Sequence, residues 1–150
     1  MKKILFIVLA AAITACSNST QRAAEAMLQK ADQQFQQGHY DRALITIDSL
    51  RKVYPGAIET RKQALRLYQN IELKRSQEEL TALDSTLEAV KQQYEALRQQ
   101  VDTHKQLLQA TPEELTLLTR TRVHRDSLQT RYDALCAKIR YIHKKQKEKS

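Results

Sequence analysis

The chain has 150 residues, with 25 Lys and Arg against 17 Asp and Glu, a length that favours one domain over two. It has only 2 Gly and 2 Pro, which excludes turn-rich all-β sandwiches and barrels, and its 2 Cys exclude a disulfide scaffold or a four-ligand zinc module. Gln, Leu, Ala, Lys, Arg and Glu are abundant and no segment alternates as a strand does, so we predict an all-α fold.

The N-terminal residues have the pattern of a secretory signal peptide. Met1-Lys2-Lys3 is basic, and an unbroken apolar run from Ile4 to Ile13 follows it. As a helix, this run covers only about 15 Å, half of a hydrocarbon core of about 30 Å, so it is too short to span a membrane. We therefore assign residues 1–15 to a cleaved signal peptide.

The run ends in Ile13-Thr14-Ala15-Cys16, an aliphatic residue and two small residues before a cysteine. This pattern resembles the lipobox of bacterial lipoproteins. The resemblance implies that the chain is cut before Cys16, that the Cys16 thiol receives a diacylglycerol and that the new amine is acylated. Ser17 is similar to the residue of lipoproteins sent to the outer membrane, so we expect a lipid-anchored protein of the bacterial cell envelope, at the outer membrane. The alternative is an ordinary signal peptide that leaves Cys16 unmodified.

Residues 16–20 are expected to be the lipidated Cys and a short polar tether, and residues 21–71 a helical base. The base begins with helices at about 21–37 and 41–54, separated by Gly38 and closed by Pro55-Gly56, with Asp41 as the N-cap of the second helix. The two helices resemble a single tetratricopeptide repeat (TPR), and the match consists of Ala31, Phe35, Gly38, Tyr40, Ala43, Ile47, Leu50 and Pro55.

The TPR resemblance implies close packing at Ala31 and Ala43, a tight turn at Gly38 and a corner filled by Phe35 and Tyr40. Lys30, Gln34 and Leu50 depart from the repeat's pattern. One repeat is unstable alone and needs a neighbour. We expect that neighbour to be the next helix, through an apolar face of Ala64, Leu65, Tyr68 and Ile71. The alternative is a plain helical hairpin.

Residues 72–150 are predicted to form an antiparallel coiled-coil hairpin. Steps of three and four residues pick out a first seam, in which nine of eleven positions are apolar. Its members are Leu73, Ser76, Leu80, Leu83, Leu87, Val90, Tyr94, Leu97, Val101, His104 and Leu108. A second seam, apolar at six of eight positions, consists of Leu118, Thr121, Arg125, Leu128, Tyr132, Leu135, Ile139 and Ile142.

The residues between the two seams predict how they pair. Thr111-Pro112-Glu113-Glu114 has the pattern of a capping box with proline at the first helical position, so the last helix begins there. A fold about residue 111 places Ile142 near Leu80 and Leu128 near Tyr94. It also sets Thr121 and Arg125 opposite Leu97–Val101, as a weak polar layer. The alternative is one continuous rod, kinked at Pro112, that dimerises in parallel.

No catalytic, cofactor-binding or metal-binding residues are predicted, and we expect the protein not to be an enzyme. The histidines His39, His104, His124 and His143 do not have metal-site spacing, and the chain lacks a Gly-rich phosphate loop and a Gly-x-Ser-x-Gly elbow. A chain of narrow helices also offers little concave surface for a small-molecule substrate. Nucleic acid is not expected as a partner of an exported protein, despite the excess of basic residues.

The function we expect is a scaffold or adaptor that is anchored in the membrane by lipid and contacts another envelope protein or a second copy of itself. The expected contacts are the helix faces around Tyr40, Tyr54 and Tyr68, and the seam. The seam candidates are Leu80, Leu83, Leu87, Val90, Tyr94, Leu128, Tyr132, Leu135, Ile139 and Ile142.

An alternative function is that of a surface-binding module. Its basic C-terminal helix would contact anionic lipid, lipopolysaccharide or cell-wall polymer. The residues proposed for this contact are Lys138, Arg140, Lys144, Lys145 and Lys147. A third possibility is an accessory subunit or chaperone for outer-membrane assembly.

Overall fold

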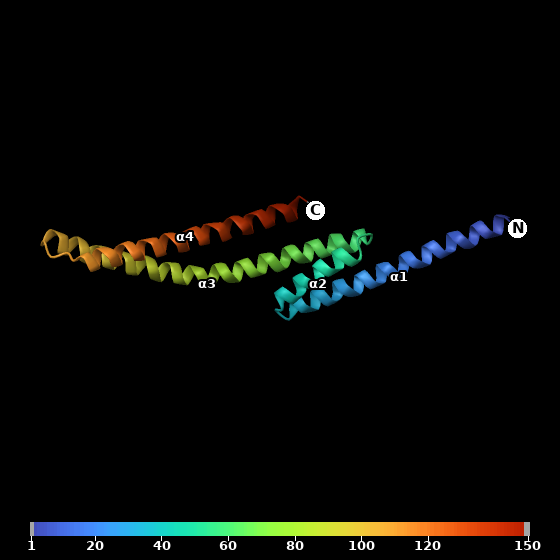
Figure 1. The fold of residues 1–150 in the computed structure, drawn as a ribbon, viewed down its shortest axis with the longest axis horizontal. Helices are drawn as coiled ribbons and strands as arrows, with labels where there is room; N and C mark the ends of the chain where they lie inside the picture. The colour runs from blue at the N-terminus through green and yellow to red at the C-terminus, as the bar shows by residue number, and fades with distance from the viewer. Residues whose placement is uncertain (1, 149–150) are drawn as a thin grey trace. The chain divides into compact units, whose positions relative to one another are not determined.

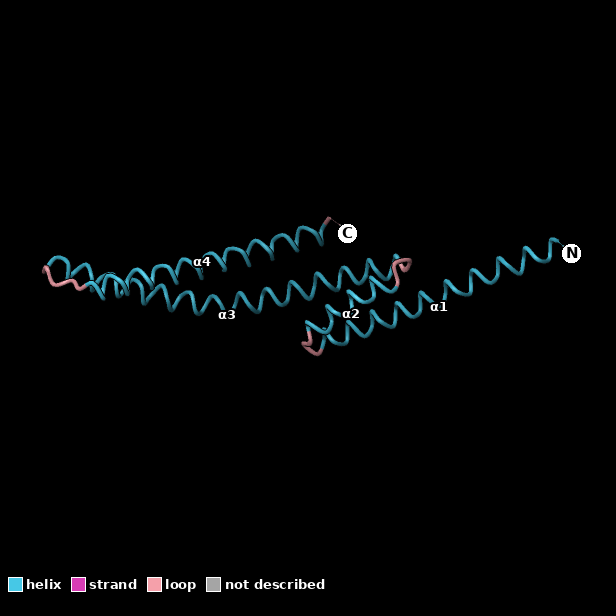
Figure 2. Tube along the Cα trace, in the orientation of Figure 1, coloured by secondary structure: helices cyan, strands magenta, loops and turns pink. Residues whose placement is uncertain are grey.

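The computed structural model describes the backbone of residues 2–148 and the side chains of residues 19–148. Its four helices are α1 (Lys2–Gln36), α2 (Tyr40–Val53), α3 (Ile58–Gln106) and α4 (Pro112–Lys147). Figures 1 and 2 show these helices and the short turns between them, with no strand in the described part of the chain. The prediction of an all-α fold is therefore confirmed. The chain divides into two compact units, Met1–Glu72 and Leu73–Ser150, with the boundary inside α3.

The side chain expected to carry the lipid, that of Cys16, lies outside the described residues. Ser19 and Thr20, at the end of the expected tether, belong to α1. Among the described residues, no helix combines the length and the apolar character needed to cross a bilayer.

The turn between α1 and α2 depends on Gly38, whose φ is +76°. The N–H of Gly38 donates to the carbonyl of Phe35 at 2.9 Å, and the N–H of His39 donates to that of Gln34 at 2.8 Å. These paired bonds form a Schellman motif, which satisfies the last carbonyls of a helix and favours glycine at this position. The N-cap of α2 is His39, which makes no side-chain cap, so the prediction of Asp41 as the N-cap is wrong. Asp41 lies in the first turn, where its charge complements the helix dipole.

The first unit has one apolar core, built from all three of its helices. The buried residues of this core are Ala31, Ala43, Ile47, Leu50, Ala64, Leu67 and Ile71. Ala31 and Ala43 allow α1 and α2 to approach closely because they lack bulk. The rings of Phe35 and Tyr40 lie 5.9 Å apart beside the Gly38 turn, as expected for residues that fill a corner.

The face that α3 turns to this core differs from the expected one. Ala64 and Ile71 are fully buried as predicted, but Leu67 is the buried residue between them. Leu67 lies three residues after Ala64 and four before Ile71, so the three side chains share one side of the helix. Tyr68 lies a third of a turn away and is exposed.

The turn between α3 and α4 repeats the Schellman motif with a leucine in the place of glycine. The N–H of Leu108 donates to the Lys105 carbonyl at 3.1 Å, and the N–H of Gln109 donates to the His104 carbonyl at 2.7 Å. Leu108 has a φ of +57° and a side chain that is 94% exposed. A left-handed conformation is strained in a residue with a Cβ, so this turn stores backbone strain.

Replacing Leu108 with glycine is expected to raise the free energy of unfolding by about 0.5–1 kcal/mol, because glycine adopts positive φ without strain. The reverse test is Gly38→Ala, which should lower it by about 1 kcal/mol through backbone strain. A Cβ at Gly38 meets nothing within 4 Å, so the stability change in Gly38→Ala reports backbone strain and not a steric clash. Urea unfolding followed by circular dichroism measures both. A stability loss in Leu108→Gly would show that the exposed side chain contributes more than the strain costs.

The start of α4 is the predicted capping box. The Thr111 hydroxyl oxygen accepts from the Glu114 N–H at 3.3 Å, and the Glu114 carboxylate accepts from the Thr111 N–H at 3.1 Å. Pro112 occupies the first helical position, where its missing N–H has no partner to lose. Residues 107–111 leave helical geometry, so the chain is not one continuous rod.

Within the second unit, α3 and α4 contact one another in reverse order along the chain. Glu79 pairs with Arg131, Tyr94 lies under Arg125, and His104 contacts Glu114. The two helices therefore run in opposite directions (Figure 1). The seam positions of α3 and α4 are buried or half-buried from Leu73 to His104 and from Leu118 to Ile142.

The pairing register of this unit differs from the expected one by about one turn. We expected Leu128 near Tyr94, but it is the Arg125 guanidinium that lies over the Tyr94 ring, with its central carbon 4.1 Å from the ring centre. The cause is the position of the reversal. Since α3 ends at Gln106, the chain turns about residue 109 and not about residue 111. A shift of this size moves α4 by about one turn along α3.

Candidate functional site

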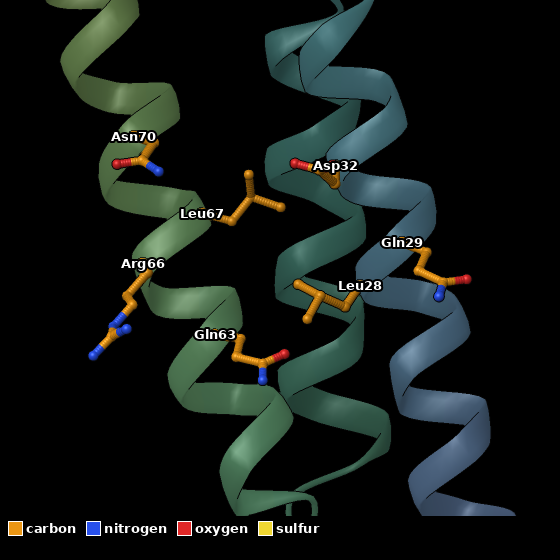
Figure 3. A pocket seen from close by; sticks show the side chains of 7 residues that line it. All are labelled: Leu28, Gln29, Asp32, Gln63, Arg66, Leu67 and Asn70. Atoms are coloured by element: carbon orange, nitrogen blue, oxygen red, sulfur yellow. The ribbon is translucent and has the colours of Figure 1, made fainter.

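A groove of about 370 Å³ lies between α1 and α3 in the first unit. Its lining residues are Leu28, Gln29 and Asp32 from α1, and Gln63, Arg66, Leu67 and Asn70 from α3. In Figure 3, Leu28 and Leu67 point toward one another from the two walls. The groove thus has an apolar centre with amide and charged groups around it, a lining suited to contact with a polypeptide segment.

The walls of the groove are held by polar contacts that tie the helices of the first unit together. Gln21 on α1 donates from Nε2 to the hydroxyl of Thr60 on α3 at 2.8 Å, and Thr60 is almost fully buried. The Thr46 hydroxyl on α2 lies 2.8 Å from Oε1 of Gln34 on α1. Gln34 departs from the repeat pattern in the sequence, and the structure shows that its amide is used in this contact between helices.

The three tyrosines expected to mark interaction faces do not line this groove. Tyr40 packs against the core beside Phe35, and Tyr54 is half-buried at the C-terminal end of α2. Tyr68 is exposed on α3, two residues from the lining residue Arg66. The groove was not predicted from the sequence, although Leu28 and Leu67 follow the helical periodicity of the core.

The seam candidates lie where the second unit packs on itself. Leu83, Leu87, Val90, Leu135 and Ile142 are buried. Tyr94 is half-buried, and so are four more of the candidates. These four are Leu80, Leu128, Tyr132 and Ile139. Packing between α3 and α4 therefore covers much of the side-chain surface of these ten seam candidates.

The expected polar layer of the seam contains Thr121 and Arg125. Thr121 is buried, and its hydroxyl donates to the Leu117 carbonyl of its own helix at 2.9 Å. Arg125 lies over the Tyr94 ring and donates to Asp126 Oδ1 at 2.7 Å. The hydrogen bonds that Arg125 donates to Asp126 raise the pKa of its guanidinium. The cation–π contact keeps this charge at the seam, since the ring face attracts a cation.

At the turn end of the second unit, Glu114 is the centre of a hydrogen-bond network. Beyond the capping box, its Oε1 lies 2.7 Å from Nδ1 of His104 and accepts from the Gln100 amide at 3.3 Å. The backbone hydrogen bond from Thr111 is the main cause that lowers the pKa of Glu114 below its ordinary value of 4.5, and His104 adds to this effect. The network joins the end of α3 to the start of α4.

The lowered pKa of Glu114 predicts a pH dependence of stability. A carboxyl with a lower pKa in the folded chain stabilises it at pH above the unfolded value, and this contribution is lost as pH falls through the folded value. Glu114→Gln should therefore lower the melting temperature at pH 7, and the difference from the parent should shrink as pH falls below 4.5. Thermal melts at several pH values measure it. The matched control is Glu113→Gln, which removes a charge from the same turn outside this network. Equal pH profiles for the two variants would contradict the role of the network.

The basic residues predicted for surface contact lie in the final turns of α4. Lys138, Arg140, Lys144 and Lys147 are exposed, and Lys145 is half-buried. Lys145 donates to Glu148 at 2.7 Å, and this hydrogen bond raises its pKa. Its ammonium also lies 5.7 Å from the Tyr141 ring centre. The structure therefore places these cations together, around an exposed tyrosine.

Groups suited to metal binding do not gather in the described part of the chain, where no three His, Cys, Asp or Glu side chains form a candidate site. Cys136 is a free, half-buried thiol on α4. Comparison of the chain with protein families, with curated proteins and with solved structures finds no match.

Proposed function

We propose that the protein is a non-enzymatic lipoprotein of the bacterial cell envelope, at the outer membrane, and that it acts as a scaffold or adaptor. The N-terminal pattern that ends in Cys16 supports the lipid anchor. A chain with two or three acyl groups stays on a membrane stably, because each buried CH₂ contributes about 0.8 kcal/mol.

The architecture behind this proposal is a TPR-like base of residues 21–71 and an antiparallel coiled-coil hairpin of residues 72–150. Support for the base comes from Ala31 and Ala43 in its core, from the left-handed Gly38 and from the contact of Phe35 with Tyr40. Support for the hairpin comes from the buried seam positions and from contacts in reverse order, such as that of Tyr94 with Arg125.

The groove between α1 and α3 is the observation that carries the scaffold function. It joins an apolar centre, Leu28 and Leu67, to amides that can bond a peptide backbone, Gln29 and Gln63. An apolar centre surrounded by polar groups is the arrangement of interfaces between proteins, and the groove has this arrangement on a small scale. The partner is another envelope protein or a second copy of this chain.

Site-specific photo-cross-linking in cells tests the groove. A photoreactive residue at Gln29 or Gln63, which line the groove, should cross-link to one and the same partner. The matched controls are the adjacent exposed positions Lys30 and Lys62, which do not line it. A product with the mass of two chains would identify the partner as a second copy. Equal yields from all four positions, or no product from any, would count against the groove as a binding site.

Metabolic labelling tests the anchor separately. Radioactive palmitate should label the chain, and Cys16→Ala should remove the label and release the chain from the membrane fraction. Label that persists in Cys16→Ala, or a parent chain without label, would overturn the lipoprotein assignment and leave the groove experiment unaffected.

A further inference from the structure

One side of the last turns of α4 carries cations around an exposed aromatic ring. Ala137, Arg140, Tyr141, Lys144 and Lys147 follow one another at spacings that place them on the same side of the helix. We call this set the C-terminal basic face. All five are exposed, and Tyr141 is 60% exposed. The apolar residues of the same segment, Ile139 and Ile142, lie on the other side and pack into the seam.

Among the described residues, two of the three cations of this face have no ion-pair partner. Arg140 and Lys147 form no ion pair with any described residue. The third, Lys144, pairs with Glu148 at 4.0 Å, and the same carboxylate also pairs with Lys145 at 2.7 Å, so one acid is shared between two lysines. Asp133, the other nearby acid, lies one turn before Ala137 and accepts from the Gln129 amide. The face therefore attracts an anionic partner.

The helix dipole explains part of this pattern and leaves part unexplained. Cations at a helix C-terminus are stabilising, but the effect falls off within the last turn. Arg140 lies about two turns before the end of α4, and the exposed Tyr141 gains nothing from the dipole. A tyrosine between cations is instead typical of the boundary between water and a bilayer. There the ring reaches the apolar edge while its hydroxyl and the cations stay with water and phosphate.

We infer that the C-terminal basic face docks on the surface of a bilayer that contains anionic phospholipids. Arg140, Lys144 and Lys147 contact lipid phosphates, and the Tyr141 ring lies at the headgroup level. A hydrated acidic polymer offers the same charge but no apolar edge for the ring, so the tyrosine favours the bilayer. The inference rests on the proposed membrane attachment only for its biological setting, because docking uses residues remote in sequence from Cys16.

Tryptophan fluorescence of the full chain in vesicles tests the docking. The chain has no Trp, so Tyr141→Trp introduces a single reporter. Its emission should shift to the blue, and be quenched by brominated lipid, in phosphatidylcholine vesicles that contain phosphatidylglycerol. Neither change should occur in phosphatidylcholine alone. High salt should reverse both changes, because it screens the exposed charges.

Two matched variants give the experiment its controls. Ile45→Trp places the reporter on α2 at a position of similar exposure, 66%, with Asp41 and Asp48 one turn away on either side, and should not respond. The second variant is the Tyr141→Trp chain in which Arg140, Lys144 and Lys147 are all replaced by Gln. Its affinity for the anionic vesicles should fall about fivefold for each charge removed, and so by about a hundredfold in all.

Three results would overturn the inference. The first is that the Tyr141→Trp chain gives the same emission spectrum in neutral and anionic vesicles, and the second is an equal response of the reporter at positions 45 and 141. The third is a response to soluble polyglutamate without any response to vesicles, which would identify an acidic polymer as the occupant. Loss of the Cys16 lipid changes none of these comparisons, so a failure here is distinguishable from a failure of the proposed anchor.

Discussion

Replacing Ile47 with alanine is expected to lower the free energy of unfolding of the first unit by about 2–5 kcal/mol. Ile47 is only 1% exposed and lies in the core shared by α1, α2 and α3. Truncation removes apolar contacts and leaves a cavity that the helices cannot fully close, and both effects destabilise the fold. Urea unfolding measures the loss, and hydrogen exchange of the α2 amides shows that it belongs to this unit.

The matched control is Ile45→Ala, two residues away on the same helix. Ile45 is 66% exposed, so the same chemical change should alter stability by less than about 0.5 kcal/mol. A similar loss in both variants would show that α2 does not bury the face described here.

The second large effect is expected from Leu87→Asp in the second unit. Leu87 is 1% exposed at a seam position of α3, and an aspartate there places a charge among apolar side chains without a partner. An uncompensated buried charge costs about 3–5 kcal/mol, so this variant should unfold the pairing of α3 with α4 at neutral pH. Hydrogen exchange of α4 amides should rise sharply, because these amides lose the cover of the packed seam.

Ala89→Asp is the control for this variant. It introduces the same charge on the exposed side of the same helix, and its cost should stay below about 1 kcal/mol, the range of helix propensity. Fast exchange of α4 in Ala89→Asp as well would contradict the assignment of the seam. Protection of α4 that survives Leu87→Asp would contradict it too.

The features that sequence reasoning predicted well depend on residues close together in the chain. The capping box at Thr111 and Glu114 and the tight turn at Gly38 each involve backbone groups within a few residues of one another. Helical periodicity placed Ala64 and Ile71 in the core and Leu83 and Leu87 in the seam for the same reason.

The predictions that were wrong concern places where two neighbouring residues both suit the same structural position. Asp41 is a good capping residue, but α2 begins at Tyr40 because the Gly38 turn already directs the chain. Tyr68 and Leu67 both suit an apolar face, and the orientation of α3 against α1 and α2 selects Leu67. The local apolar pattern of α3 does not show this orientation, because the orientation depends on how the three helices pack together.

The amino-acid sequence by itself determined the helical class, the turns between helices, the heptad seams and the N-terminal pattern that ends in Cys16. Only the tertiary structure decided the register of α3 and α4 and the existence of the groove. A heptad seam repeats every seven residues, so the seams alone allow more than one alignment, and the short left-handed turn at Leu108 limits which alignment brings Arg125 over Tyr94. The groove needs Leu28 and Leu67, far apart in the chain, to face one another, and only the packing of α1 and α3 places them so.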